Sequence, residues 1–354
     1  MNIEKLEQFL QENNLPKFRL GQIQKAIFVD GVSSFAEITT LSKDLREKME
    51  KEMKLLSFEV EKVLVAADGQ SIKALLKTAD DNLIETVLIS PKPGTWSACI
   101  SCQVGCAMGC RFCATGKMGF KRNLTAEEIT DQILFWKQYL KRALSCHEYM
   151  TSSPEGRGAV LSNIVFMGMG EPFNNWQEVS QSIKDLTNEK LFGFGSRSLS
   201  VSTSGIAEGI ERMAYEFPQV NLAISLHFTS DEKRDRYMPV NKKDNLENLR
   251  QALKKYFAIT KRKVFLEYIM LDGINDTALD AKLLSDFICS VGRAHLLHMN
   301  LIRYNATSEN LKPSSKTRTQ IFKQELEKYG INATIRKSLG DEIKAACGQL
   351  AGEK

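Results

Sequence analysis

Beyond Trp96, short apolar runs alternate with longer stretches of helical periodicity, and this alternation constrains the fold more than any other feature. The expected strands are 98–103, 164–169, 199–203, 220–226, 264–270 and 296–302, with a short one at 332–337. The expected helices are 125–141, 176–187, 206–216, 245–258, 276–290 and 316–329. A capping box from Thr125 to Glu128 begins the first helix. Such repetition predicts a parallel sheet, either open or curled into a barrel.

Polar residues at the ends of separate strands decide between these two arrangements. They lie at or just past the carboxyl ends of expected strands: Gly170-Glu171, Ser202-Thr203-Ser204-Gly205, Ser225-Leu226-His227 and Asn305. A barrel builds its site from many strand ends on one rim, whereas an open sheet concentrates its site at one switch point. Six strand–helix units are too few to close an eight-stranded barrel. We therefore predict an α/β protein with a partial (βα)6 TIM-like barrel.

The chain of 354 residues is long enough for one large domain and a smaller one. Residues 1–52 have apolar side chains at helical spacing and are expected to form a small helical domain. Residues 53–95 are expected to form a short antiparallel β meander that ends in a linker, Pro91-Lys92-Pro93-Gly94. The barrel would then span residues 96–350. Within it, segment 142–160 is expected to be a mobile insertion without recognisable chemistry.

Five of the eight cysteines crowd into the fifteen residues from Cys99 to Cys113. Disulfide frameworks are typical of short secreted chains, and this chain is long and starts without the apolar core of a secretory signal. No apolar run approaches the ~18 residues that a membrane span requires. We therefore expect a cytoplasmic protein whose cysteines serve metal or redox chemistry. The net charge of +5 permits a nucleic-acid partner without requiring one.

Three of these cysteines form a C-x3-C-x2-C motif: Cys106, Cys110 and Cys113. Three thiolates can wrap one face of a 4Fe–4S cube and leave one iron open for another ligand. Gly105 and Gly109 allow the tight loop that such a wrap needs. A structural zinc site is the alternative, because Cys102 could supply the fourth ligand that zinc requires.

An aromatic residue, Phe112, precedes the last cysteine, and such a motif resembles the signature of the radical S-adenosylmethionine (radical SAM) superfamily. Further segments sharpen the resemblance: Cys99–Cys106, Phe112–Gly116, Phe166–Pro172, Ser202–Gly205, Ile224–His227 and Gly340–Leu350. Together they resemble one subfamily, the dual-specificity RNA adenine-C2 methyltransferases (RlmN), with the adenine-C8-methylating Cfr enzymes as near relatives. The resemblance covers almost the whole chain, in order.

The resemblance implies two cofactors, a 4Fe–4S cluster held by the three cysteines of the motif and S-adenosylmethionine (SAM), two molecules of which are consumed per turnover. The methionine part of one SAM would bind the open iron, and Gly170-Glu171 would grip its amino group. Other residues match positions that line the SAM pocket in the family: Ser202, Ser225, Leu226, His227 and Asn305.

The resemblance also implies an unusual methyl transfer, because adenine C2 is electron-poor and cannot attack SAM as a nucleophile. Cys347 would take a methyl group from one SAM. A radical made from the second SAM would activate that S-methyl group for addition to C2. Cys99 would release the product by forming a disulfide bond with Cys347, which a thiol reductant must then reduce. Glu85 resembles the proton acceptor of the family.

The substrates implied are the adenine in the peptidyl-transferase region of 23S rRNA and the adenine next to the anticodon of some tRNAs. Residues 1–52 resemble the accessory domain of the family and are a candidate for gripping RNA. The family also implies an electron donor such as flavodoxin or ferredoxin, no membrane, and a monomer. Basic residues that could follow phosphates cluster at Lys117, Lys121, Arg122, Lys254, Lys255, Lys261-Arg262-Lys263 and Arg336-Lys337.

Two alternative functions stay open. A Cfr-like adenine-C8 methyltransferase of 23S rRNA shares nearly every motif, and only Pro172 after Glu171 favours the C2 enzymes. A zinc-stabilised RNA-binding module without catalysis would hold zinc rather than iron and would give Cys347 no role.

Cys102 departs from the family pattern, because relatives commonly carry a small residue at this position. Its place in the sequence would let it compete with Cys99 as the resolving thiol or bind the cluster. Cys146 and Cys289 are expected to be inert, as free cysteines often are.

Overall fold

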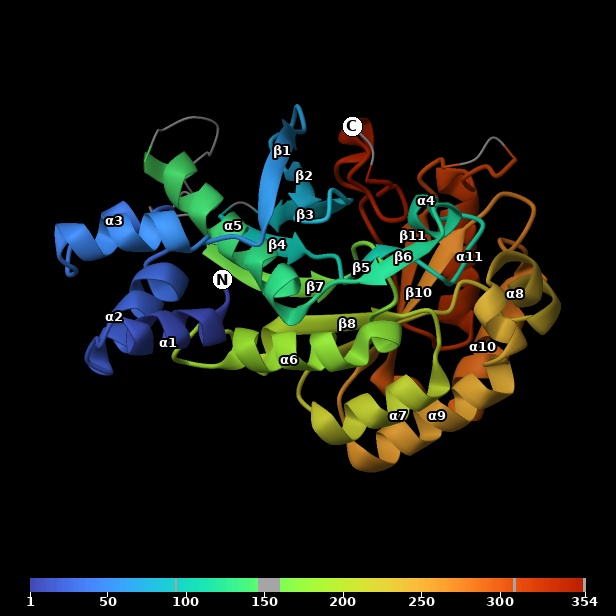
Figure 1. Ribbon diagram of the computed structural model, residues 1–354. Helices are drawn as coiled ribbons and strands as arrows, with labels where there is room; N and C mark the ends of the chain where they lie inside the picture. Colours follow the sequence, from blue (N-terminus) through green and yellow to red (C-terminus); the bar gives the residue numbers. More distant parts are fainter. Residues whose placement is uncertain (93, 146–159, 308–309, 353–354) are drawn as a thin grey trace.

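The computed structural model describes residues 1–92, 94–145, 160–307 and 310–352 (Figure 1). In this part of the chain one large sheet dominates, and its strands pair antiparallel up to the fourth strand and parallel from there on. The strand order is β1 (Phe58–Val65), β2 (Ser71–Thr78), β3 (Leu83–Lys92), β4 (Thr95–Cys99), β7 (Val160–Phe166), β8 (Leu199–Thr203), β9 (Asn221–Ser225), β10 (Val264–Met270), β11 (Leu297–Arg303) and β12 (Ala333–Ile335).

Helices cover the outer face of the parallel strands, as Figure 1 shows. They are α5 (Ala126–Ser145), α6 (Trp176–Thr187), α7 (Ala207–Glu216), α9 (Leu246–Ile259), α10 (Ala278–Val291) and α11 (Lys316–Lys328). The capping box is present, since Glu128 N–H donates to Thr125 Oγ1 (3.2 Å) and Thr125 N–H donates to Glu128 Oε2 (3.0 Å). The predicted alternation of strands and helices is confirmed, and it builds the predicted partial barrel.

The β meander extends the barrel sheet, because β3 pairs antiparallel with β4. The prediction of a linker at 91–94 is therefore wrong for Pro91 and Lys92, which belong to β3. Lys92 pairs with Thr95, so the two strands continue close to the tight connection between them. Alternate residues of the meander face opposite sides. Both sides of β2 are covered, so nearly all of this strand is buried, whereas the edge strand β1 is largely exposed.

The N-terminal region is helical, as predicted, and packs beside α5 (Figure 1). Its helices are α1 (Ile3–Glu12), α2 (Phe18–Gln24), the π-helix η1 (Lys25–Val29) and α3 (Lys43–Glu52). Polar side chains of α5 cap the chain that follows η1: Gln138 Nε2 donates to Val32 O, and Lys141 Nζ donates to Asp30 O, both at 2.8 Å. The apolar side chains of these helices join the core of the barrel in one continuous cluster.

Shorter elements lie on the connections, several of them at the carboxyl ends of the strands. The run expected as one strand over 98–103 is divided, since β4 ends at Cys99 and a two-stranded sheet of β5 (Gln103–Gly105) and β6 (Phe120–Asn123) follows. Two short helices complete the rim, α4 (Ala114–Lys117) and α8 (Asp231–Tyr237). Single 3-10 turns are η2 (Phe35–Glu37), η3 (Pro172–Asn175), η4 (Ser196–Ser198), η5 (Pro239–Lys242), η6 (Ala294–Leu296) and η7 (Asp341–Ile343).

The expected insertion at 142–160 is described only at its two ends. Residues 142–145 belong to α5 and Val160 begins β7, while Cys146 and the rest of the segment lie outside the described residues. Among the described helices, none combines the length and the apolar character needed to cross a membrane.

Thr86 links α5 to the strand that carries Cys99. Trp136 Nε1 donates to Thr86 Oγ1 (3.0 Å), and Thr86 Oγ1 donates to the carbonyl oxygen of Cys99 (2.9 Å). Thr86→Val would leave these buried groups without partners, so we expect it to lower the free energy of unfolding by about 1–3 kcal/mol. Thr86→Ser, which keeps the hydroxyl, should stay close to wild type. Urea denaturation of the two variants checks this, and equal midpoints would contradict it.

Candidate active site

The three cysteines of the motif lie on a loop that the β5–β6 hairpin closes. Cys106 N–H donates to Gly119 O across the hairpin (2.9 Å). Gly105 has a φ of +74°, and a Cβ atom there would lie 1.9 Å from Gly119 O. Only glycine tolerates this contact, as the sequence predicted. Gly109, with a φ of +62°, turns the chain between the first two cysteines.

The thiols of Cys106, Cys110 and Cys113 lie close enough to affect one another. Burial raises the pKa of the Cys106 thiol to about 12, and the Glu171 carboxylate and the Cys113 thiol contribute to the rise. Burial also raises the pKa of the Cys110 thiol, and the nearby Cys113 and Cys106 thiols raise it further. The three thiols and Glu171 therefore lie within electrostatic range of one another.

This donor set fits a 4Fe–4S cluster. In the described part of the chain, no three His, Cys, Asp or Glu side chains converge closely enough to hold one metal ion. A zinc ion needs its sulfur ligands about 2.3 Å away, whereas an iron–sulfur cluster binds each thiolate to a different iron. Three neighbouring but separated thiols suit the cluster, and binding would hold them as thiolates.

Glu171 provides a buried carboxylate beside the cysteine loop. Its Oε2 accepts from the Ser204 N–H (2.7 Å) and hydroxyl (2.8 Å), and its Oε1 accepts from the Phe173 N–H (3.3 Å). Burial raises the pKa of Glu171 despite these neutral donors. Gly170 precedes it with a φ of +109°, and a Cβ atom there would lie 2.6 Å from Gln103. An ammonium group would stabilise this desolvated carboxylate, so Glu171 suits the amino group of SAM.

The other predicted SAM-pocket residues lie on the rim, as expected. Ser202 in β8 and Ser225 at the end of β9 are half-buried, and Leu226 is fully buried. His227 has a φ of +55°, and its Nδ1 accepts from the Ile269 N–H (3.1 Å). Burial lowers the pKa of His227 to about 3, so the ring is neutral and carries its proton on Nε2.

Asn305 holds the chain at Cys347. Its Nδ2 donates to the Cys347 carbonyl oxygen (3.2 Å), and its Oδ1 accepts from the Ser338 hydroxyl (2.6 Å). A second contact ties the same stretch to the cysteine loop, since Ala114 N–H donates to Gly348 O (2.7 Å). The rim, the cysteine loop and the C-terminal chain therefore meet.

Cys347 lies within electrostatic range of Cys99 although the sequence separates the two residues widely. Burial raises the pKa of the Cys99 thiol, and the nearby Cys347 thiol adds to the rise. Burial likewise raises the pKa of the Cys347 thiol, against the opposing effect of the Arg336 guanidinium, and Cys113 lies within range. Residue Cys347 as a whole is exposed, so the burial that raises its pKa comes from the protein packed around its thiol, and both thiols are free. The Cys347 thiol is therefore near enough to affect the pKa of Cys99, and the main-chain contacts at Cys347 and Gly348 put this stretch beside the cysteine loop.

Cys102 points elsewhere. Its side chain is 2% exposed, and its sulfur would lie 2.9 Å from a Cβ atom on Gly170. Its electrostatic neighbours are Glu171 and Cys106, whereas those of Cys347 include Cys113. Cys347 contributes to the raised pKa of Cys99 but not to that of Cys102, which favours Cys99 as the partner of Cys347. Cys289 is exposed on α10, away from these thiols.

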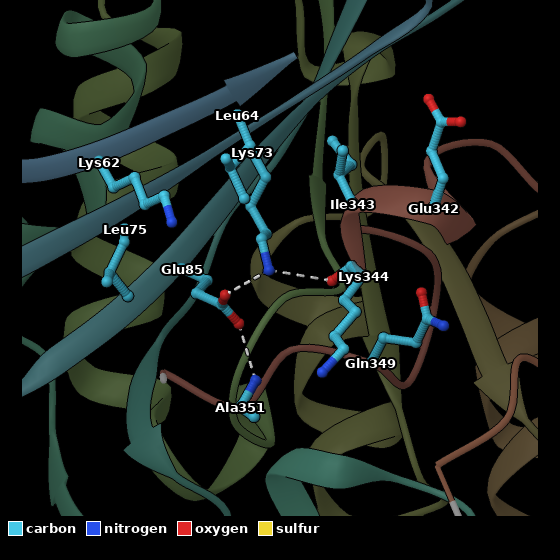
Figure 2. Close-up of a pocket in the computed structure, with 10 residues that line it drawn as sticks. All are labelled: Lys62, Leu64, Lys73, Leu75, Glu85, Glu342, Ile343, Lys344, Gln349 and Ala351. Carbon is cyan, nitrogen blue, oxygen red and sulfur yellow. Dashed lines mark hydrogen bonds and ion pairs between the residues drawn. The ribbon is translucent and has the colours of Figure 1, made fainter. Parts of the chain in front are cut away.

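Glu85 lies on β3 with both carboxylate oxygens occupied (Figure 2). Oε1 pairs with Lys73 Nζ on β2 (2.7 Å), and Oε2 accepts from the N–H groups of Ala351 (2.7 Å) and Gly352 (3.2 Å). Sequence reasoning missed Lys73. A lysine between apolar neighbours, Ile72 on one side and Ala74-Leu75-Leu76 on the other, is the signal that could have revealed it.

Arg234 is the other residue that sequence reasoning missed. It is fully buried, and its guanidinium donates to Ser204 O (3.0 Å), Asn241 Oδ1 (2.9 Å) and Leu226 O. It thereby joins the loops after β8 and β9. Burial lowers the pKa of Arg234 to about 10, so it stays charged at neutral pH. The surrounding helix α8 is rich in charges, and nothing in its sequence distinguishes this arginine from a solvated one.

Part of the basic surface predicted for RNA is engaged within the protein. Arg122 pairs with Asp80 (2.6 Å) and Glu128 (2.8 Å), and Lys255 pairs with Glu211 (2.9 Å). Lys117 Nζ donates to the carbonyl oxygen of Thr307 (2.6 Å), and Lys121 Nζ donates to Asn82 Oδ1 (3.1 Å).

The barrel and the three-cysteine loop define the class, a radical SAM enzyme. Residues 100–283 match the model of the "Radical SAM superfamily", and residues 1–55 match the "Ribosomal RNA large subunit methyltransferase N-terminal domain". Radical SAM proteins use a 4Fe–4S cluster and SAM, which are therefore the cofactors of this chain.

Proteins that are similar to this chain over nearly its full length identify the subfamily within this class. The "Ribosomal RNA large subunit methyltransferase Cfr" of Bacillus velezensis is 39% identical over 352 residues, 98% of this chain and 95% of that protein. The protein of the same name from Clostridium botulinum (strain Okra) is 40% identical over 351 residues, 99% and 96% of the two chains. A crystal structure of a radical SAM methyltransferase from Sphaerobacter thermophilus has a TM-score of 0.88 and 37% identity, covering 100% of this chain and 98% of that one. The chain belongs to the RlmN/Cfr subfamily of radical SAM methyltransferases.

Gly105→Ala and Gly119→Ala form a matched pair of variants, because both glycines have a φ of +74° but only a Cβ atom at Gly105 would meet a main-chain oxygen. We expect Gly105→Ala to open the hairpin and to lose most of its iron and sulfide after anaerobic reconstitution. Gly119→Ala carries only backbone strain of about 1–2 kcal/mol and should retain the cluster. Equal iron content in the two variants would show that this contact does not shape the loop.

Proposed function

We propose that this enzyme methylates C2 of an adenine in 23S rRNA, in the peptidyl-transferase region, and C2 of the adenine next to the anticodon in some tRNAs. The observation that supports the proposal is the position of Cys347 beside the three-cysteine loop, where Asn305 and Ala114 bind the main chain at Cys347 and Gly348 and the thiol lies within electrostatic range of Cys99. The printed names of the relatives support large-subunit ribosomal RNA as the substrate. Pro172 after Glu171 resembles the C2 enzymes and supports that position.

The rim residues would bind and orient the cofactors. Cys106, Cys110 and Cys113 would hold the cluster, and Glu171 would bind the amino group of SAM. The remaining pocket positions are Ser202, Ser225, Leu226, His227 and Asn305. When bound, the cofactors supply a methyl group from one SAM and a hydrogen-abstracting 5′-deoxyadenosyl radical from another.

Cys347 and Cys99 would carry the methyl group and release the product. The Cys347 thiolate takes the methyl group, and the resulting S-methyl group loses one hydrogen atom and adds through carbon to adenine C2. Attack of Cys99 on the sulfur of Cys347 breaks the carbon–sulfur bond and forms a disulfide. The adenine keeps a methyl group, and one proton and one electron leave. A thiol reductant supplies two electrons to restore both thiols.

Glu85 as the proton acceptor of this reaction stays a prediction. In the described structure its carboxylate is bound by Lys73 and by the main chain after Cys347, so it has no oxygen free for a substrate proton.

Methylation at adenine C8 of 23S rRNA is the second candidate. The relatives named above carry the name Cfr, and their similarity to this chain supports this reaction. The two reactions share the thiols and the cofactors, so only the product separates them. The match to the superfamily model disfavours the remaining alternative, a zinc-stabilised RNA-binding module.

The proposal also covers the location, the oligomeric state and the partners of the enzyme. It would act as a cytoplasmic monomer and receive electrons from a small carrier such as flavodoxin or ferredoxin. The helices of residues 1–52 would contribute to RNA binding, which the match to an N-terminal domain of ribosomal RNA methyltransferases supports.

Nucleoside mass spectrometry with chromatographic standards tests the reaction. We expect 2-methyladenosine in 23S rRNA from cells that lack their own enzyme and carry this gene. The product should disappear with Cys347→Ala and persist with Cys289→Ala, a matched control because Cys289 is exposed on α10. An 8-methyladenosine peak would establish the second candidate. Neither product from iron-loaded protein, on rRNA or tRNA, would contradict the proposal.

Arg336 should set the pH dependence of Cys347 methylation, because its positive charge lowers the pKa that burial raises. Thiolate is the reactive form, so Arg336→Gln should shift the rise of S-methylation rate with pH to higher pH. Arg336→Lys keeps the charge and should follow the wild type, as should Lys337→Gln. Mass spectrometry of the Cys347 peptide across a pH series measures this shift. Identical profiles for Arg336→Gln and wild type would rule out the electrostatic role.

A further inference from the structure

The C-terminal segment, residues 340–352, lies directly against the β meander at both of its ends. A Cβ atom on Gly340 would lie 2.9 Å from Ser71 Cβ on β2, and one on Gly352 would lie 2.7 Å from Leu83 O on β3. Both glycines have positive φ values, +75° and +60°. The backbone approaches the sheet too closely for any larger residue at these two points. Cys347 lies between them.

Lys73 and Glu85 bind the C-terminal segment on both sides of Cys347 (Figure 2). Lys73 Nζ donates to the carbonyl oxygen of Lys344 (3.2 Å), before the cysteine. Glu85 Oε2 accepts from the N–H groups of Ala351 (2.7 Å) and Gly352 (3.2 Å), after the cysteine. The ion pair between Lys73 and Glu85, at 2.7 Å, connects the two attachments. Lys344 has a φ of +51°, a conformation that such neighbours must hold in place.

The Lys73–Glu85 ion pair is buried, so both charged groups need hydrogen-bond partners from the protein instead of water. The Lys73 side chain is 10% exposed and that of Glu85 is 2% exposed. A buried ion pair is tolerated only when further hydrogen bonds satisfy its remaining groups, and loss of one partner leaves an uncompensated charge. Here the main chain of the C-terminal segment supplies those further bonds. The pair and the segment therefore stabilise each other, and loss of either charge weakens the attachment of the segment on both sides of Cys347.

We propose that Lys73 and Glu85 are positioning residues that hold Cys347 in place opposite Cys99 for its methylation. This rests on the proposed function, in which Cys347 carries the methyl group. The two residues bind the main chain before and after the cysteine. Asn305 and Ala114 bind the carbonyl oxygens of Cys347 and Gly348 and so hold the cysteine itself on the rim. Holding a reacting group in place matters because a displacement of about 1 Å can lower a rate about a hundredfold.

The positioning of Cys347 and the acceptance of a proton by Glu85 belong to different steps of the reaction. A positioning pair acts when Cys347 is methylated, which needs SAM but no RNA. A proton acceptor acts only after RNA has bound and its C2 has been attacked. The S-methylation of Cys347 in the absence of RNA therefore separates the two roles of Glu85.

The experiment uses cluster-loaded, anaerobic enzyme with SAM and a chemical reductant, without RNA. The test variants are Lys73→Met and Glu85→Gln. Lys73→Arg is the conservative variant, and Lys62→Met is the matched control, since Lys62 lines the pocket of Figure 2 together with Lys73 and Glu85 but is exposed. Three quantities are measured: S-methylation of Cys347 by peptide mass spectrometry, release of 5′-deoxyadenosine, and hydrogen exchange of the Ala351 and Gly352 amides.

We expect both neutral variants to slow Cys347 methylation about tenfold or more and to speed exchange of the two amides. Release of 5′-deoxyadenosine should stay within about twofold of wild type, because the cluster and SAM sites are separate from the pair. Lys73→Arg should recover most of the rate, and Lys62→Met should match wild type.

Three outcomes would overturn the proposal. Cys347 methylation at the wild-type rate in Glu85→Gln would exclude a positioning role for Glu85, and loss of RNA methylation by the same variant in a parallel assay with RNA would leave it the role of proton acceptor only. Loss of 5′-deoxyadenosine release in both neutral variants would make the pair a general support of the fold. Slow methylation in Lys73→Arg equal to that in Lys73→Met would rule out a role for the charge. By contrast, wild-type enzyme that releases 5′-deoxyadenosine but never methylates Cys347 would overturn the proposed function, and this result is distinct from the other three.

Discussion

The antiparallel pairing of β3 with β4 is the constraint on which the site depends. Val87 on β3 lies opposite Cys99 on β4, and Glu85 lies on the same face as Val87 because side chains alternate along a strand. Cys99 and Glu85 therefore share one face of a continuous sheet. The C-terminal segment crosses this face and brings Cys347 with it. The meander thus does more than extend the barrel, since it fixes one thiol relative to the other.

The burial of ionisable groups on this rim determines which ligands it is suited to bind. The Cys106 and Cys110 thiols and the Glu171 carboxylate are buried with raised pKa values, so the protein alone stabilises their ionised forms poorly. Binding of iron to the thiols and of an ammonium group to Glu171 would relieve that cost, because opposite charge favours the ionised forms. The buried Arg234 places a positive charge behind the same rim and joins two of its loops. This desolvated site is therefore suited to binding charged ligands.

The local pattern of the sequence predicted the barrel well. Strand–helix alternation, the capping box at Thr125 and the glycines of the cysteine loop depend on neighbouring residues, and the structure confirms them. The motif cysteines and Glu171 were found because the spacing of motifs is visible in the sequence. The pairing of β3 with β4 was missed because Pro91 and Lys92 suggest a linker, although both belong to a strand. Lys73 and Arg234 were missed because their partners are distant in sequence, and an isolated lysine or arginine is most often solvated.

The juxtaposition of Cys347 and Cys99 is tested most directly by oxidative trapping. Mild oxidation of the cluster-loaded protein with a thiol-specific oxidant, followed by peptide mapping, identifies which cysteine bonds to Cys347. A disulfide forms readily only between cysteines whose Cα atoms lie about 4.4–6.8 Å apart. We expect the Cys99–Cys347 peptide pair as the main product. A bond from Cys347 to Cys102 or Cys113, or no bond to Cys347, would contradict the arrangement of the site.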